Sequence, residues 1–206
     1  MFIFDRPYQY FEEPWAHIVI ENVLPKKVAD HMLHNWPETN VYNLENKEEI
    51  NRSNVLLEPI LNFGANSDDP IYEEFEYVNY VQRTDEILET AAKIFNDPDP
   101  YDCDLTDLAY REVKREASAP VVLVRDWHTD NPQKKYNSVL YIGSGENAGF
   151  QAKNEKTGID KMYEYRHNRL IWWRNTREAV HRFYSGNASR KTINLSSDFK
   201  QPKKDY

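Results

Sequence analysis

The spacing of apolar residues changes along the chain, and it predicts helices before strands. HIVIENVL (17–24) is typical of a short strand, and PKKVADHMLHNW (25–36) is typical of a helix with a proline in its first turn. Apolar residues recur at helical intervals over 69–96, which predicts one long helix or two helices broken near Thr84. The segment 37–66 is rich in Asn and Glu and has no clear period, so we expect irregular structure there.

After a loop at 97–104, the chain consists of short runs rich in β-branched and aromatic residues, separated by turns such as GSGENAG and KNEKTGIDK. The runs that we expect to form strands are 108–114, 120–127, 136–142, 170–174, 180–184 and 190–195. Because these strands follow the helices and do not alternate with them, a regular α/β fold is disfavoured. We therefore predict an α+β fold, in which N-terminal helices pack against one sheet of a double-stranded β-helix (jelly-roll) core.

The length of 206 residues suits one domain with a sizeable core, which we expect to span 1–206. Its helical part would cover about 1–100 and its jelly-roll core about 105–198. Cys103 is the only cysteine, so no disulfide can form within the chain. The N-terminus lacks the pattern of a secretory signal and no apolar run is long enough to cross a membrane, so we expect a cytoplasmic protein with no membrane partner.

The net charge of the chain indicates which class of partner it binds. The formal net charge is −8, from 34 acidic and 26 basic residues. A protein that binds nucleic acid through the phosphate backbone normally carries a basic face, so this balance argues against nucleic acid. A small molecule or a peptide is the expected partner, and the sequence leaves the oligomeric state open.

The stretch RDWHTDNPQKKYNSVLYIG (125–143) places His128 and Asp130 two residues apart beside an apolar run. Side chains two apart on a β-strand point to the same face of the sheet. An imidazole and a carboxylate on one face supply two of the three protein ligands of a non-haem iron site. The sequence therefore predicts a metal centre whose third ligand comes from another segment. His31 and His34 fit a solvated helix surface better than a metal site.

His181 is the best candidate for the third ligand, because it lies in an expected strand that ends at the turn SGNA. A hairpin through this turn would place Phe183 opposite Arg190 and His181 opposite Thr192. His181, Arg190 and Thr192 would then share one face of a sheet, with Arg190 diagonal to the histidine. A metal ligand and a guanidinium are thus expected in one cavity.

These motifs resemble the 2-oxoglutarate- and Fe(II)-dependent oxygenases, and in particular their prolyl-hydroxylase-like branch. HTDNP is similar to that branch's His-x-Asp motif with its following Asn-Pro, and NRLIWWRNTREAVHRF is similar to the segment that carries the distal histidine. Arg190, nine residues after His181, stands where the family has its co-substrate Arg or Lys. PWAHIVIENVLPKKVADHML resembles the family's entry strand and helix. The likeness touches about 14–36 and most of 120–197, while 37–119 carries no matching motif.

The resemblance implies a jelly-roll enzyme that uses Fe(II), O2 and 2-oxoglutarate as co-substrate. The residues implied in metal binding and catalysis are His128, Asp130 and His181. Those implied in binding the distal carboxylate of 2-oxoglutarate are Arg190, Tyr141 and, as a second candidate, Thr192. Those expected at the substrate mouth are Arg125, Trp127 and Trp173. Strand alternation places one of Trp172 and Trp173 in the core and the other outside. Related halogenases lack the carboxylate of the His-x-Asp motif, so its presence here favours hydroxylation.

Three functions remain open at this point. We favour a hydroxylase of prolyl or other amino-acid side chains, free or in a peptide, which would release succinate and CO2. The second is an oxygenase of another substrate, such as nucleic acid, against which the acidic balance weighs. The third is a metal-binding jelly-roll of cupin type without oxygen chemistry, which has no need of Arg190. Small members of the family occur in bacteria and phages, and a phage-encoded chain would work in the host cytoplasm.

Overall fold

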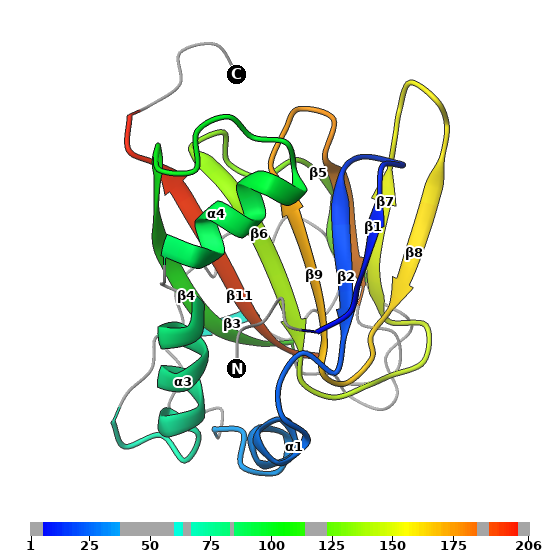
Figure 1. Cartoon of the computed structure of the whole chain (residues 1–206). Coiled ribbons are helices and arrows are strands. Elements are labelled where there is room, and N and C mark those ends of the chain that lie inside the picture. Colours follow the sequence, from blue (N-terminus) through cyan, green and yellow to red (C-terminus); the bar gives the residue numbers. More distant parts are fainter. Residues whose placement is uncertain are drawn as a thin grey trace.

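The computed structural model consists of two antiparallel β-sheets, with helices packed on the larger one (Figure 1). It describes residues 6–37, 60–63, 67–82, 85–113, 123–184 and 190–201. The helices in these ranges are α1 (Lys26–His34), α3 (Tyr72–Gln82) and α4 (Asp85–Ile94). None of the helices in these ranges is long and apolar enough to cross a membrane.

Within the described ranges, the larger sheet has seven strands and the smaller sheet has four. From edge to edge, the larger sheet contains β1 (Tyr8–Phe11), β2 (His17–Glu21), β9 (Arg169–Arg174), β6 (Lys134–Tyr141), β11 (Arg190–Phe199), β4 (Cys103–Val113) and β3 (Ile60–Phe63). The smaller sheet contains β5 (Leu123–His128), β10 (Val180–Tyr184), β7 (Gly149–Lys153) and β8 (Asp160–Glu164). Consecutive strands therefore often lie in different sheets, as β9, β10 and β11 do.

The helices cover the outer face of the larger sheet, the face that points away from the smaller sheet. Figure 1 shows α4 lying across the strands of the larger sheet. One buried apolar cluster joins the two layers, and its members include Ile18, Leu140, Trp172 and Ile193 from strands and Met32, Phe75 and Ile87 from helices. Just after α4, Phe95 stacks on Tyr136 of β6, with ring centroids 5.9 Å apart. The N-terminal helices thus pack against one sheet, as the sequence predicts.

A second buried cluster fills the space between the two sheets. It includes Val139, Tyr141, Ile171 and Trp173 from the larger sheet, and Phe150, Ala152 and Phe183 from the smaller one. Trp172 and Trp173 follow the strand alternation, one in each cluster, but both are buried, at 3% and 2% exposure. The expectation that one of them lies outside the core is wrong, because the helices cover the outer face as well.

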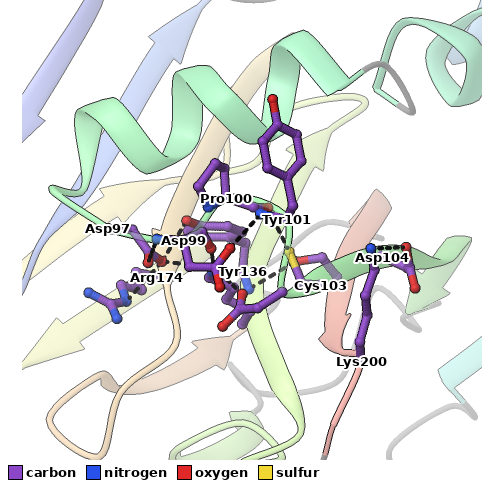
Figure 2. A network of polar contacts seen from close by, with 12 residues as sticks. Asp97, Asp99, Pro100, Tyr101, Cys103, Asp104, Tyr136, Arg174 and Lys200 are labelled. Carbon is purple, nitrogen blue, oxygen red and sulfur yellow. Dashed lines mark hydrogen bonds and ion pairs between the residues drawn. The ribbon is translucent and has the colours of Figure 1, made fainter.

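A buried polar network ties the end of α4 to the start of β6 (Figure 2). The Tyr136 hydroxyl donates to Oδ2 of Asp97 over 2.8 Å, and Nε of Arg174 lies 3.6 Å from the same oxygen. The fully buried Nζ of Lys135 lies 3.1 Å from Asp97 and also contacts Asp102. Burial alone would raise the pKa of Asp97, but the hydrogen bonds that it accepts, with the one from Tyr136 foremost, hold this pKa below its ordinary value.

Most of the expected elements form, and the differences have physical causes. The helical segment comprises two elements, since α3 ends at Gln82 and α4 begins at Asp85, and the expected break at Thr84 itself lies outside the described residues. The sequence pattern does not predict β1, β3, β7 or β8. The strand β8 (DKMYE) alternates exposed and half-buried positions and carries charges at both ends, so its composition is that of a turn-rich connection. The strand β3 lies within the expected irregular segment 37–66, most of which is outside the described residues.

Candidate metal centre

Three side chains that could ligate a metal converge at one end of the smaller sheet. His128 ends β5, Asp130 follows two residues later, and His181 lies near the start of β10. The two histidines are direct partners in the antiparallel ladder, and their ring centroids are 4.4 Å apart. One ligand atom from each of the three residues lies within 4.8 Å of the other two. This is the one such cluster of His, Cys, Asp or Glu in the described parts of the chain.

Neighbouring groups orient two of these side chains. Nδ1 of His181 donates to the carbonyl oxygen of Ala179 over 2.8 Å, so that nitrogen carries the proton. In the neutral ring Nε2 then keeps its lone pair, and this atom lies 3.5 Å from Oδ2 of Asp130. Nδ2 of Asn137, on the facing sheet, donates to the same carboxylate oxygen over 3.1 Å. Such outer hydrogen bonds fix ring and carboxylate orientation at metal sites.

Aromatic rings enclose the histidine pair. His181 is completely buried, and its ring lies 5.1 Å from both Trp173 and Phe150 and 5.4 Å from Phe183, measured between centroids. The indole nitrogen of Trp15 donates to the carbonyl oxygen of Val180, which closes the cluster from the side of β2. The site is therefore dry on the side of the rings. Two imidazole nitrogens and one carboxylate in such a setting match the donor set of non-haem Fe(II) sites with open coordination positions.

Arg190 is buried between the sheets, close to this cluster. Its guanidinium carbon lies 4.7 Å from the ring centroid of Phe183, the residue that also contacts His181. Its Nε and Nη1 are buried and have no hydrogen-bond partner among the described residues. Burial lowers the pKa of Arg190, while the neighbouring hydroxyls of Tyr141 and Tyr165 act in the opposite direction. A buried cation with unused N–H groups is costly unless an anion or another acceptor pairs with it.

Arg190 lies on a different sheet from His181, contrary to the sequence prediction. The expected hairpin, with Phe183 opposite Arg190 and His181 opposite Thr192, does not form. Strand β10 pairs with β5 and β7, whereas β11 pairs with β4 and β6 in the other sheet. Thr192 is instead the ladder partner of Tyr141. The guanidinium therefore approaches the histidines across the gap between the sheets, not along one strand pair.

The two other residues expected at the co-substrate lie on the same inner face as Arg190. Tyr141 is completely buried, and its ring centroid is 5.1 Å from that of Tyr165. Tyr165 in turn donates from its hydroxyl to the carbonyl oxygen of Ile142 over 2.7 Å. Oγ1 of Thr192 is buried and has no hydrogen-bond partner among the described residues. The structure thus gathers Arg190, Tyr141 and Thr192 on one patch.

The residues expected at the substrate mouth are placed differently from one another. Trp173 contacts His181 and faces the space between the sheets. Trp127 does not: it lies against Arg182 at 4.4 Å and Lys153 at 5.5 Å on the outer face of the smaller sheet. The expectation for Trp127 is wrong because it precedes His128 by one residue and alternation turns it away. The side chain of Arg125 lies outside the described residues.

A cavity of about 150 Å³ opens beside Asp130. It is lined by Asp130, Asn131, Lys134, Asn137, Ser138, Trp173, Phe183, Asn194, Leu195 and Ser196. The sequence motifs point to Asp130 and Trp173 in this set and to none of the polar residues on β6 and β11. The signal that could have found Asn194 and Ser196 is the alternation that starts at Arg190, since every second residue of β11 shares its face.

No protein-family model matches the sequence, and no curated protein matches it. Solved structures do match. A prolyl hydroxylase from Trichoplax adhaerens, in complex with a peptide of the hypoxia inducible factor oxygen degradation domain, superposes with a TM-score of 0.63 at 12% identity, covering 89% of this chain and 84% of that one. The chain has the fold of 2-oxoglutarate-dependent oxygenases. A prolyl-4-hydroxylase from Pseudomonas putida has a TM-score of 0.56 at 11% identity, with 90% and 93% covered.

A viral collagen prolyl hydroxylase from Paramecium Bursaria Chlorella virus-1, in its 2-oxoglutarate complex, has a TM-score of 0.53 at 9% identity, covering 90% of this chain and 96% of that chain. The predicted resemblance to the prolyl-hydroxylase-like oxygenases is thereby confirmed at the level of the fold. At such identities the likeness speaks for the fold, and the chemistry must be argued from the side chains of this chain.

Proposed function

We propose that this chain is a 2-oxoglutarate- and Fe(II)-dependent dioxygenase with a jelly-roll core, which hydroxylates a prolyl or other amino-acid side chain, free or in a peptide. The reaction would convert a C–H bond of the substrate into C–OH, with one atom of O2 entering the substrate and the other entering succinate as CO2 leaves. The observation that carries this proposal is the buried guanidinium of Arg190, with two N–H groups unpaired in the described parts of the chain, beside a His-Asp-His cluster.

The metal would be held by His128, Asp130 and His181. Three protein ligands leave three coordination positions of an octahedral ion for co-substrate and O2. Iron and 2-oxoglutarate, when bound, supply the oxidation of the substrate C–H bond. The chain's part is to fix the ligands and to limit water. The carbonyl of Ala179 holds the His181 ring, Asn137 holds one oxygen of the carboxylate, and the aromatic rings close the apolar side.

The distal carboxylate of 2-oxoglutarate would pair with Arg190. A guanidinium offers parallel N–H groups that match both oxygens of a carboxylate, and the unpaired Nε and Nη1 belong to that fork. The hydroxyl of Thr192, also unpaired among the described residues, and that of Tyr141 would add neutral donors. A cupin-type binder without this co-substrate would leave the buried cation of Arg190 uncompensated, which is why we favour the oxygenase.

Calorimetric titration of 2-oxoglutarate into the Mn(II)-loaded protein tests the proposal. Arg190→Met should lower the affinity for 2-oxoglutarate at least about tenfold, since truncating one partner of a desolvated charge pair costs about 2–5 kcal/mol. Mn(II) should stay bound, and Arg190→Lys should restore part of the affinity. Arg182→Met is the matched control, because Arg182 lies on the outer face of the smaller sheet, over the ring of Trp127. Absence of 2-oxoglutarate binding by the wild type would contradict the proposed function.

A further inference from the structure

The cavity beside Asp130 is separate from the patch proposed for 2-oxoglutarate. The residues that line it do not include Arg190, Tyr141 or Thr192. It shares Asp130 with the metal cluster and Phe183 with the surroundings of Arg190. A group bound in this cavity would therefore contact Asp130 without contacting those three residues.

Strand β11 connects the two places. Arg190, Thr192, Asn194 and Ser196 alternate on its inner face, because Thr192 and Asn194 pair with residues of β6 whose side chains lie in the inner cluster. Ser196 lies six residue steps along the strand from Arg190, a length of about 20 Å. The Arg190 end offers a cation for the co-substrate. The Asn194–Ser196 end lines the cavity and offers neutral polar groups.

The polar groups of the cavity have a defined donor and acceptor pattern. Oδ1 of Asn194 is buried and has no hydrogen-bond partner among the described residues, so it requires an N–H or O–H donor. Oγ of Ser196 accepts from Nζ of Lys134 over 3.1 Å, and the Ser196 hydroxyl has one O–H of its own to donate. The cavity thus presents a buried acceptor on Asn194 and a hydroxyl donor on Ser196.

We propose that this cavity binds the primary carboxamide of an asparagine or glutamine side chain, which makes a carboxamide-bearing residue the substrate of the dioxygenase. This inference rests on the proposed function and names its substrate class. The carboxamide NH2 donates to Oδ1 of Asn194, and its carbonyl oxygen accepts from the hydroxyl of Ser196. The volume suits one small side chain, since a cavity of about 150 Å³ holds a molecule the size of benzene. A prolyl ring has no donor for Asn194 and would leave its buried oxygen unsatisfied.

The hydroxylated carbon then lies between the carboxamide and the metal. Asp130 belongs both to the cluster and to the cavity wall, so a side chain seated there brings its carbons next to the carboxamide toward the ligand set. Trp173 and Phe183 supply the apolar contact for those carbons. The C–H bond that breaks is one of theirs, and O2 and 2-oxoglutarate supply the oxygen atom and the two electrons.

The test measures binding, apart from turnover. The probes are the Nα-acetyl-N-methylamides of Asn, Gln, Asp, Leu and Pro, which share a backbone and differ in the side chain. Each is titrated into the Zn(II)- and 2-oxoglutarate-loaded protein by ligand-observed NMR. The same titration with Mn(II) adds line broadening of the protons nearest the metal. The Asn or the Gln probe should bind at least about tenfold tighter than the Leu and Pro probes, with its side-chain CH2 protons broadened most.

Variants of Asn194 locate the effect. Asn194→Leu should lower the affinity for the carboxamide probe at least about tenfold. Its affinity for 2-oxoglutarate should stay unchanged, which also shows that the variant is folded. Asn194→Asp retains an acceptor oxygen at this position, so it should retain the affinity for the carboxamide probe. Gln151→Leu, an amide on the outer face of the smaller sheet, is the control and should change nothing.

Tightest binding of the Asp, Leu or Pro probe would overturn the inference, as would unchanged carboxamide binding by Asn194→Leu. Either result leaves the proposed function standing, provided that 2-oxoglutarate still binds. Failure of 2-oxoglutarate to bind the wild type is the different result that would remove the proposed function itself.

Discussion

Asn137 and Asp130 join the two sheets at the metal centre, because Nδ2 of the amide donates to Oδ2 of the carboxylate over 3.1 Å. The amide comes from β6 of the larger sheet, whereas the carboxylate follows β5 of the smaller one. Asn137 is 6% exposed, so this hydrogen bond is protected from water. It holds the carboxylate of Asp130 in one orientation.

We therefore expect Asn137→Ala to lower metal affinity by about 10–100-fold, the range found when an outer hydrogen bond to a ligand is removed. Competition titration of Mn(II) or Zn(II) against a chelator of known affinity measures this. Gln151→Ala is the control, because this amide lies on the outer face of the smaller sheet, where it accepts from Arg182. Equal metal affinity in Asn137→Ala and the wild type would show that the carboxylate needs no such support.

Removing a metal ligand should have a larger effect. His128→Ala and His181→Ala should each abolish stoichiometric binding of one Fe(II) per chain, because two ligands do not hold the ion at a three-ligand site. Metal analysis after anaerobic loading and gel filtration provides the measurement. His31→Ala should bind as much iron as the wild type, since His31 lies on α1 and contacts Glu74. Retention of iron by both site variants would refute the ligand set.

His17 should make stability depend on pH. Its buried ring donates from Nδ1 to the carbonyl oxygen of Trp15 and accepts from the Tyr163 hydroxyl at Nε2, and burial lowers its pKa from 6.5 to about 4. Between these values the unfolded chain binds the proton and the folded chain does not, so stability falls as pH drops from 6.5 toward 4. The loss approaches about 1.4 kcal/mol per pH unit. In denaturant titrations across this window, His17→Phe should lose stability less steeply than the wild type. If the free energies of unfolding of His17→Phe and the wild type fell with equal slopes across this pH range, protonation of His17 would not be the cause.

The network at the start of β6 should govern global stability. Lys135→Met leaves Asp97 buried without its ammonium partner, and breaking a buried pair costs about 3–5 kcal/mol. Because the pKa of Asp97 is held below its ordinary value of about 3.9, its own contribution is complete above that pH and is lost as pH falls below it. Urea unfolding at pH 7 and at pH 3 measures both effects. Lys156→Met, at an exposed position, should stay within about 0.5 kcal/mol of the wild type.

Local spacing was enough to predict that His128, Asp130 and His181 come together. His128 and Asp130 are neighbours on one face whatever the sheet around them, and His181 needed only to lie on an adjacent strand. The position of Arg190 could not follow from the same reasoning, because a short turn does not determine whether the next strand stays in the sheet or crosses to the other one. Both arrangements bury the same residues, and the choice depends on β4 and β6 as partners.

The polar cavity wall was not predicted, for a different reason. Asn137 and Asn194 lie in alternating strands, where a polar residue ordinarily marks the solvent face. Asn137 and the Oδ1 atom of Asn194 are nevertheless buried, because the smaller sheet covers this face. Trp127 shows the converse, since an aromatic beside a motif histidine suggested a cavity wall and instead lies outside against Arg182.

The chain passes from the smaller sheet at β10 to the larger sheet at β11, so under the proposed function the co-substrate would connect the two sheets. The metal ligands belong mainly to the smaller sheet and Arg190 to the larger one, so a molecule held at both ends would act as a removable cross-link between two layers. Amide hydrogen exchange in β5, β10 and β11 should then slow more with metal and 2-oxoglutarate together than with either alone. Once succinate has left, the cross-link is gone, and the layers are most free to separate in the interval when the modified substrate must depart.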